Sequence, residues 1–418
     1  MTALLDRKEV LYNFSWRALQ LGARQGAAFL IFFIAAYYVA PEELGMFVYV
    51  LAVMQLIIIF CDFGFSSSAT RYVAEHSAKG SGDAGTILYS VSAVVAGISV
   101  VVSLVIILAG RDLLENYILF LYFLPFLLLS PLSSVAGGVY TGLKKFRKLS
   151  IIGVVAAGVS VPLSFFLITL FGIPGAIASH NLLFFLLTVG LFVLLREAKF
   201  GIDFSIARKI VKYGVLIGLA NVAYFLYTNV DIIILKHFNY VTEIAYYEIV
   251  NKIFRVLFIP AAILGQVIAP DITRSITRGQ ERKVYRTIYT ILPKFLAVGI
   301  ALSIVLYFVF PQILTLYFPE YYTDAFQLIF TILLIVLPFK LWGVFLTVGF
   351  ITPGGFVKIV TITTFIGGIL NVILDIVLIT WLGFIGVFLA TLIVHSLSII
   401  SVTVWFGVRL KQRIHGAI

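Results

Sequence analysis

Twelve long apolar runs constrain this chain more than any other feature of its sequence. Each run has roughly the 20 residues that an α-helix needs to cross the hydrocarbon core of a bilayer. The runs are continuous, whereas half-buried strands show alternation. Of the 418 residues, 61% are hydrophobic and only 12% are charged, against about 25% charged in a soluble protein. This composition excludes a soluble enzyme and predicts an all-α integral membrane protein of twelve transmembrane helices.

The positions of the predicted spans leave only short connections. The spans are expected at residues 15–38, 44–68, 85–109, 116–140, 149–171, 175–195, 211–235, 243–269, 287–310, 323–349, 356–379 and 383–408. The longest polar connections are predicted at 70–84, 196–210 and 270–286. Residues 201–213 mix apolar side chains with Lys and Arg, which is typical of an amphipathic helix lying on a membrane surface.

The distribution of basic residues predicts the orientation of the chain. The net charge is +11, and cytoplasmic loops of membrane proteins collect Lys and Arg. If the N-terminus is cytoplasmic, 22 of the 30 Lys and Arg residues lie in inside segments, 2 lie outside and 6 lie within spans. We therefore expect a multi-pass protein of the cytoplasmic membrane with both termini cytoplasmic, and no nucleic-acid partner.

The two halves of the sequence resemble each other in parallel order. The pattern R-K-x-V-x-Y begins at Arg7 and again at Arg208, and a Gly-x-x-Gly joint begins at Gly172 and again at Gly383. A repeat of six spans inserts with the same orientation twice, as in transporters built from two parallel bundles. The sequence predicts two pseudo-symmetric six-helix bundles, residues 1–200 and 201–418.

The first span carries a polar stripe that includes two arginines. Asn13, Arg17, Gln20 and Arg24 are spaced so that they share one face of a helix. A charged side chain deep in a bilayer costs at least about 2.5–3.5 kcal/mol unless it faces a cavity or a partner. Arg24 lies about 14 Å into the span at 1.5 Å per residue, so a water-filled cavity beside it is predicted.

The eighth span carries a second stripe, formed by Glu248, Lys252 and Arg255. Glu248 and Lys252 are four residues apart and are expected to pair, which leaves Arg255 without a local partner. A structural ion-pair network is the alternative interpretation. Asp231 and Asp375 are expected near the outer ends of their spans, where hydration is cheap. The secondary candidates for the site are Gln20, Asp62, Glu248, Lys340, Asn371 and Asp375.

The charged residues predicted inside the membrane are biased toward cations. Arg17, Arg24, Lys252 and Arg255 are therefore the primary candidates for binding an anionic head group such as phosphate or pyrophosphate. No Walker A, HExxH or GxSxG sequence occurs, so neither ATP hydrolysis nor hydrolase chemistry is supported.

Several segments across the whole chain resemble one superfamily of exporters. They are SWRALQLGARQG in the first span, Asp62-Phe63-Gly64-Phe65 followed by ATRYVAE, TGLKKF after the fourth span, NVDIIILKHF, YEIVNKIFRVLFIPAAILGQVIAPDITR, and NVILDIVLITWLGFIGVFLAT. Together they resemble the multidrug/oligosaccharidyl-lipid/polysaccharide (MOP) exporter superfamily, and within it the Wzx-type polysaccharide flippases.

This resemblance implies a MATE-like fold and a flippase that moves polyprenyl-(pyro)phosphate-linked oligosaccharide to the outer leaflet. It implies a central cavity in which Arg17, Arg24 and Arg255 meet the pyrophosphate. No cofactor is expected, and transport is expected to be coupled to H+, Na+ or the membrane potential. Membrane lipids and polysaccharide polymerase or assembly proteins are the expected partners of a monomer. Two alternatives remain open: a MATE-like cation or drug antiporter, and a lipid scramblase or non-transporting assembly scaffold.

Overall fold

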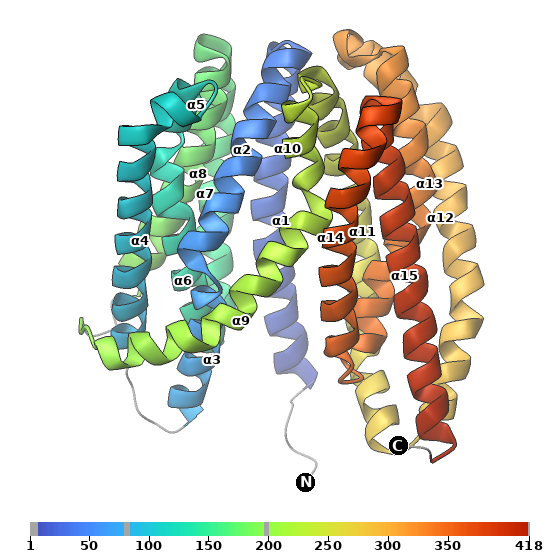
Figure 1. The fold of residues 1–418 in the computed structure, drawn as a ribbon. Coiled ribbons are helices and arrows are strands. Elements are labelled where there is room, and N and C mark those ends of the chain that lie inside the picture. The colour runs from blue at the N-terminus through green and yellow to red at the C-terminus, as the bar shows by residue number, and fades with distance from the viewer. Residues whose placement is uncertain (1–6, 79–83, 196–199, 417–418) are drawn as a thin grey trace. The chain divides into compact units, whose positions relative to one another are not determined.

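The computed structural model describes residues 7–78, 84–195 and 200–416, and these residues form a succession of helices (Figure 1). In chain order the elements are α1 (Arg7–Tyr38), α2 (Pro41–Asp62), α3 (Phe65–Ala78), α4 (Ala84–Leu113), α5 (Tyr117–Tyr122), α6 (Leu124–Gly142), α7 (Phe146–Phe171), α8 (Ile173–Val193), α9 (Phe204–Thr228), α10 (Val230–His237), α11 (Val241–Thr277), α12 (Glu281–Tyr317), η1 (Pro319–Tyr321), α13 (Asp324–Leu346), a π-helical turn (Thr347–Ile351), α14 (Val357–Leu382) and α15 (Phe384–Ile414).

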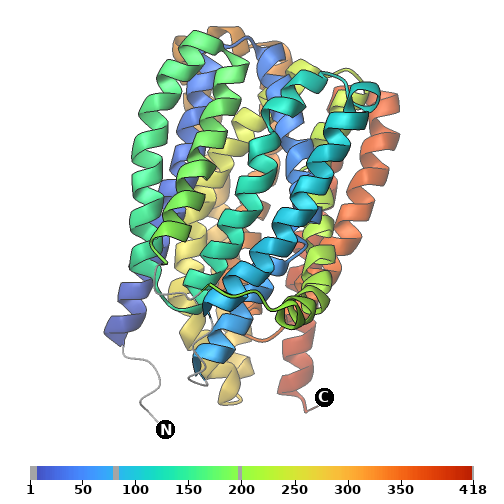
Figure 2. The same ribbon diagram turned by 90° about the vertical axis from the view of Figure 1, so that its left-hand side faces the viewer.

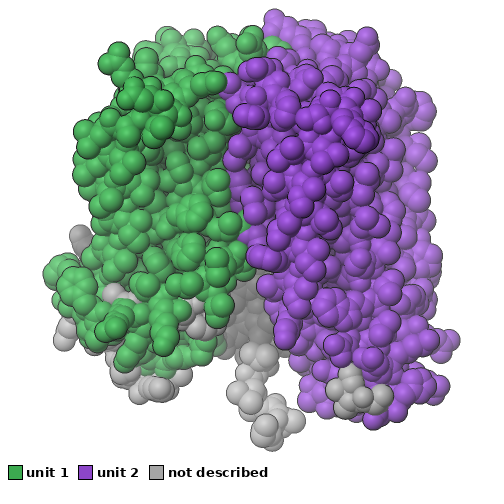
Figure 3. Space-filling view, viewed as in Figure 1, with its two compact units in different colours: residues 1–222 green, residues 223–418 purple. Residues whose placement is uncertain are grey.

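The helices confirm a multi-pass membrane protein. Within the described residues, eleven helices are long and apolar enough to cross a membrane, and the number is twelve when the bent α9 is counted as one span. The chain forms two compact units, Met1–Val222 and Ala223–Ile418 (Figure 3). The division falls inside α9, whereas the boundary predicted from the repeat lies at residues 200 and 201.

Several predicted loops are wrong, because helices continue through them. α3 runs on to Ala78, α11 ends at Thr277 and α12 begins at Glu281, so residues 70–78 and all of 270–286 except 278–280 are helical. A polar stretch need not end a helix, because a helix that emerges from a bilayer keeps its backbone hydrogen bonds among polar side chains.

The predicted second span, 44–68, is broken where α2 meets α3. Phe63 and Gly64 both have positive φ, 35° and 80°, a conformation that glycine adopts without strain. The break lies against α9: a Cβ on Gly64 would stand 2.7 Å from the Gly214 carbonyl oxygen, and one on Gly218 would stand 2.6 Å from the Phe63 ring. Gly214 and Gly218 therefore form a notch in α9 that receives the α2–α3 break.

The first half of α9 runs crosswise to the other helices of its unit (Figures 1 and 2). Phe204–Lys212 meets Gly214–Thr228 at 45°. The turn before it is fixed by Asp203, whose backbone N–H donates to Ser90 Oγ at 2.8 Å and whose Oδ1 accepts from the Ser205 N–H at 2.7 Å. The hydrogen bonds from Ser205 hold the pKa of Asp203 below its usual value. Arg208, Lys209 and Lys212 are exposed along this segment.

The Gly-x-x-Gly joint found twice in the sequence has the same structure in both units. Gly172 (φ 59°) ends α7 and Gly383 (φ 62°) ends α14, and each begins the next helix at once. The second glycine of each joint touches the preceding helix: a Cβ on Gly175 would stand 1.9 Å from the Leu167 carbonyl oxygen, and one on Gly386 would stand 2.3 Å from that of Leu378. Only glycine fits these positions, which supports the internal repeat.

Candidate functional site

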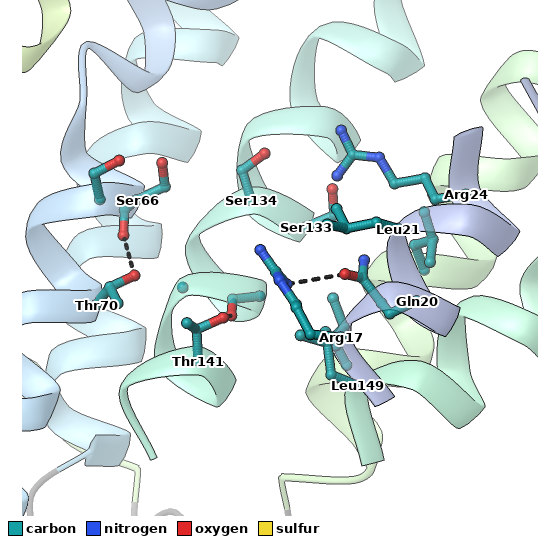
Figure 4. Close-up of a pocket in the computed structure, with 15 residues that line it drawn as sticks. Arg17, Gln20, Leu21, Arg24, Ser66, Thr70, Ser133, Ser134, Thr141 and Leu149 are labelled. Carbon is teal, nitrogen blue, oxygen red and sulfur yellow. Dashed lines mark hydrogen bonds between the residues drawn. The ribbon is translucent and has the colours of Figure 1, made fainter. Parts of the chain in front are cut away.

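The first unit contains a polar pocket of about 230 Å³ between five of its helices (Figure 4). α1, α3 and α6 supply its polar side chains, and α7 and α8 add leucines. The lining residues are Arg17, Gln20, Leu21, Arg24, Ser66, Ser67, Thr70, Ser133, Ser134, Gly137, Gly138, Thr141, Leu149, Leu187 and Leu191. All three polar residues predicted on the first span from Arg17 onward therefore line one pocket.

Two arginines of α1 project into this pocket, one above the other in Figure 4. The guanidinium of Arg17 donates from Nη1 to Gln20 Oε1 at 2.9 Å, and Gln20 is only 6% exposed. The guanidinium carbon of Arg24 lies 5.8 Å from the centre of the Phe184 ring. No carboxylate is among the residues that line the pocket, so its formal charge is positive.

The wall opposite α1 is made of hydroxyl groups. Ser66, Ser67 and Thr70 come from α3, and Ser133, Ser134 and Thr141 come from α6. Ser66 and Thr70 lie on the left side of Figure 4. Two close contacts bring these helices together: a Cβ on Gly138 would stand 2.5 Å from the Ser66 carbonyl oxygen, and one on Gly142 would stand 2.6 Å from that of Thr70. Small residues thus place the hydroxyl groups of two helices on one surface.

Asp62, a secondary candidate, lies at the α2–α3 break and binds Ser66, one of the hydroxyl residues of this wall. Its Oδ1 accepts the Ser66 backbone N–H at 3.0 Å and its Oδ2 accepts the Ser66 hydroxyl at 2.7 Å. A carboxylate that binds the first free N–H groups of a helix stabilises the start of that helix. Asp62 therefore does not line the pocket but orients Ser66, which does.

In the second unit, α11 carries an ion cluster in which one acid serves two cations. Glu248 Oε1 lies 3.2 Å from Lys252 Nζ and 3.7 Å from Arg255 Nη2. The prediction that Arg255 lacks a local partner is wrong. Helix side chains lean toward the N-terminus of their helix, so the long side chain of Arg255 reaches back over two turns. Lys252 is 12% exposed and Arg255 is 48% exposed at the side chain.

A buried hydrogen-bond cluster surrounds Asp231 of α10. Its carboxylate accepts hydrogen bonds from Tyr247 Oη at 2.5 Å, Asn371 Nδ2 at 2.6 Å and Thr391 Oγ1 at 2.9 Å. Asn371 Nδ2 also lies 3.2 Å from Asp375 Oδ2. The expectation that Asp231 and Asp375 are hydrated near span ends is wrong, because both are fully buried. Two pairs of consecutive helices, α10 with α11 and α14 with α15, enclose them.

Two acceptor oxygens of this cluster have no hydrogen-bond donor among the described residues. They are Oδ1 of Asn371 and Oδ1 of Asp375, and both are buried. Lys340 of α13 interacts electrostatically with Asp231 and with Arg255. The ring of His395 lies against the Tyr227 ring, with 4.1 Å between ring centres and 41° between ring planes.

The sequence matches the family described as "Polysaccharide biosynthesis protein" over residues 10–276, which is more than half of the chain. The chain belongs to this family. No curated protein matches it.

Solved structures show the fold that this family member adopts. It is similar to an inward-facing multidrug resistance MATE family transporter of the MOP superfamily, with a TM-score of 0.78, 14% identity, and coverage of 95% of this chain and 98% of the other. A eukaryotic MATE transporter matches with a TM-score of 0.68 and 12% identity over 98% and 99% of the two chains.

A third solved structure differs from these in its pocket. It is a MOP superfamily transporter from Pyrococcus furiosus, in which reverse polarity of the binding pocket suggests a different function. It matches with a TM-score of 0.64 and 13% identity over 97% of this chain and 96% of the other. The MATE-like fold expected from the sequence is confirmed by these three structures.

Sequence reasoning missed the residues of the site that come from other helices. Asp231 was not placed in the site, and Tyr247 and Thr391 were not singled out. The run Ser66-Ser67-Ser68-Ala69-Thr70 and the run Ser133-Ser134 are the local signals of the hydroxyl wall, since adjacent hydroxyl residues are unusual in an otherwise apolar span.

Proposed function

We propose that the protein is a flippase that moves polyprenyl-(pyro)phosphate-linked oligosaccharide from the cytoplasmic to the outer leaflet. The observation that carries this proposal is the pocket of the first unit, where Arg17 and Arg24 face a hydroxyl wall and no acid lines the cavity. A guanidinium is a planar fork whose N–H groups match the oxygens of a phosphate. An anion therefore satisfies both arginines, which the lining of the pocket leaves without a counter-charge.

The size of the pocket fits part of a ligand. Sites that enclose a whole drug-sized molecule measure about 300–1,000 Å³, and this pocket measures about 230 Å³. The Cα atoms of Arg17 and Arg24 are separated by seven residues, or about 10 Å along the helix axis. This separation suits a diphosphate, or a phosphate with its first sugar, held between two arginine side chains that lie two helical turns apart.

A MATE-like antiporter for cationic drugs is less well supported. A cationic drug needs a carboxylate to meet its charge, and none is among the residues that line this pocket. The similarity to the Pyrococcus furiosus transporter, for which reverse polarity of the pocket suggests a different function, favours the same distinction. Matching the family of polysaccharide biosynthesis proteins supports a glycan-bearing substrate.

We propose that the Asp231 cluster binds the cation whose gradient drives transport. Its residues offer only oxygen atoms, from two carboxylates, an amide and hydroxyls, and such hard ligands suit H+ or Na+. Buried polar atoms normally have partners, and a cation supplies one for Oδ1 of Asn371 and Oδ1 of Asp375. Rocking of the two predicted bundles would expose each site to opposite sides of the membrane in turn.

Transport in proteoliposomes tests the flippase proposal. Purified protein is reconstituted without ATP, with a fluorescent polyprenyl pyrophosphate that carries a short glycan, under an imposed Na+ or H+ gradient. An impermeant glycosidase then reports how much glycan crosses the bilayer. We expect gradient-dependent transfer by the wild type and little transfer by Arg24→Ala. A fluorescent phospholipid without glycan is the comparison substrate. Its transfer at the same rate would support a scramblase instead.

The direction of transport depends on the orientation of the chain. We propose that both termini and the segments 144–148 and 196–213 are cytoplasmic, from the distribution of Lys and Arg. Single cysteines at Glu42 and Lys145, in a variant that lacks Cys61, are expected to react with an impermeant thiol reagent from opposite sides. Reaction from the same side would contradict the proposed orientation.

A further inference from the structure

The hydroxyl groups opposite the two arginines are not all free to donate. Ser66 Oγ donates to Asp62 Oδ2 at 2.7 Å, and Thr70 Oγ1 donates to the Ser66 carbonyl oxygen at 3.1 Å. Ser133 Oγ donates to the Ser130 carbonyl oxygen and Thr141 Oγ1 to that of Gly137, each at 2.8 Å. Four of the six hydroxyl groups in the pocket lining therefore use their one proton inside the protein.

A hydroxyl group has one proton and two lone pairs. When the proton is donated to a neighbouring carbonyl or carboxylate, the group presents only lone pairs to a ligand. The arginine guanidinium is the reverse, since it carries five N–H donors and accepts no hydrogen bond. The pocket is thus divided into a donor side on α1 and an acceptor side on α3 and α6 (Figure 4).

We propose that Ser66, Thr70, Ser133 and Thr141, together called the acceptor wall, bind the hydroxyl groups of the sugar that is attached to the phosphate. The inference rests on the proposed function and assigns the two halves of the ligand to opposite sides of the pocket. The phosphate lies against Arg17 and Arg24, and the first sugar lies against the acceptor wall.

The chemistry of phosphate favours this placement over the opposite one. A phosphate diester or pyrophosphate carries acceptor oxygens and negative charge, so lone pairs on the acceptor wall would repel it. Sugar hydroxyl groups can donate, and each donor that leaves water must find an acceptor or lose its hydrogen bond. A ligand that is anionic at one end and rich in hydroxyl groups at the other satisfies both sides at once.

Asp62 acts here as a positioning residue. Its carboxylate accepts from both the backbone N–H and the hydroxyl of Ser66, which fixes the direction of the Ser66 lone pairs. A side chain without an acceptor at this position would free the Ser66 proton, and the wall would then offer a donor to the ligand. This gives the acid in the first unit a role that does not require it to touch the substrate.

Binding of three probes to the full-length protein in detergent tests the acceptor wall. The probes are inorganic pyrophosphate, undecaprenyl pyrophosphate without sugar, and undecaprenyl pyrophosphate with one hexose. The variants are Thr141→Val, which keeps the shape and removes the hydroxyl, and Thr141→Ser, which restores a hydroxyl. Thr169→Val of α7 is the matched control, because Thr169 Oγ1 donates in the same way to the Phe165 carbonyl oxygen at 2.8 Å but lines no part of this pocket.

We expect Thr141→Val to lower the affinity for the hexose-bearing probe by about two- to tenfold, the range for one neutral hydrogen bond. Its affinity for the two probes without sugar should match that of the wild type. Thr141→Ser should restore the affinity for the hexose-bearing probe, and Thr169→Val should bind all three probes like the wild type. Arg24→Ala should lower the affinity for all three probes.

The outcomes separate the two proposals. If Thr141→Val weakens the sugar-free lipid as much as the hexose-bearing lipid, or weakens neither, the acceptor wall is wrong and the proposed function stands. If the wild type binds none of the three probes, or Arg24→Ala binds all of them normally, the proposed function is wrong and the acceptor wall falls with it.

Discussion

The pocket of the first unit and the clusters of the second unit differ in whether their charged side chains have partners within the protein. Around Arg17 and Arg24 none of the described residues that line the cavity is a carboxylate, and four of the six hydroxyl groups there donate their proton within the protein. Around Glu248 and Asp231 almost every charge meets a partner within the unit. Charge that a protein leaves uncompensated in an apolar setting must be met by a ligand or by water.

This difference suggests a division of labour between the units. In the proposed function an anionic substrate completes the first unit, whereas the proposed cation of the second unit meets Oδ1 of Asn371 and Oδ1 of Asp375, which have no donor among the described residues. Substitutions can separate the two cases. Some remove a partner that the protein supplies to a charged group, and others remove a group that the proposed ligand would meet.

The largest effect is expected from Glu248→Gln, which removes the shared counter-charge of Lys252 and Arg255. Loss of one partner from a buried ion pair costs about 3–5 kcal/mol, because the remaining charge stays buried, and Lys252 is only 12% exposed. The thermal unfolding midpoint in detergent should fall sharply. Asp271→Asn is the matched control, since its pair with Arg274 at 3.7 Å is exposed and such pairs contribute about 1 kcal/mol or less. Equal midpoints for the two variants would contradict this view of the second unit.

Arg24→Ala is expected to have the next largest effect, on binding and not on folding. Charge-assisted hydrogen bonds contribute about 1.5–3 kcal/mol, so affinity for a polyprenyl pyrophosphate should fall by roughly ten- to a hundredfold. Arg24→Lys should restore little of it, because an ammonium lacks the planar fork. Lys294→Ala, on α12, should bind and transport almost normally. Wild-type transport by Arg24→Ala would mean that the pocket is not the anion site.

Asp231→Asn tests whether the second unit is the cation site. One of its three hydrogen-bond donors loses its acceptor, at a cost of about 1–3 kcal/mol, and the cluster loses a negative charge. Transport driven by a Na+ or H+ gradient should cease, while affinity for pyrophosphate at the first unit should equal that of the wild type. Isothermal titration with pyrophosphate and gradient-driven uptake measure the two properties separately. Retained gradient dependence would contradict the assignment.

The smallest effect is expected from Gln20→Leu, which removes the acceptor that holds Arg17 at 2.9 Å. Arg17 keeps its charge but loses its fixed direction, and one hydrogen bond is worth about 0.5–1.5 kcal/mol. Affinity for pyrophosphate should fall by about two- to tenfold, less than for Arg24→Ala. A loss as large as that of Arg24→Ala would show that Gln20 itself contacts the ligand.

The parts of the site that were predictable from the sequence are those that depend on one helix. Arg17, Gln20 and Arg24 follow helical spacing, so their common face could be predicted before any tertiary structure was known. Arg255 already required a further fact, the lean of side chains toward the helix start. The Asp231 cluster could not be derived, because its partners Asn371 and Thr391 are 140 and 160 residues away in the chain.

The fold shows the same limit. Apolar runs predicted the membrane helices, because each run follows from local composition. The break after Asp62 was missed, because its cause is the packing of Gly64 against α9. A glycine in the middle of an apolar run has no local signal that separates a break from a close contact.

The notch formed by Gly214 and Gly218 also determines how the chain is assembled during synthesis. The residues of the α2–α3 break are synthesised first. The glycines of α9 against which they pack are synthesised about 150 residues later. Until then the Phe63 ring has no glycine surface to pack against. A fragment that stops at residue 200 contains six predicted spans but lacks this surface, whereas a cut after Val222 retains it. The first unit is therefore completed only when α9 has been synthesised, and the C-terminal residues of α9 belong to the second unit.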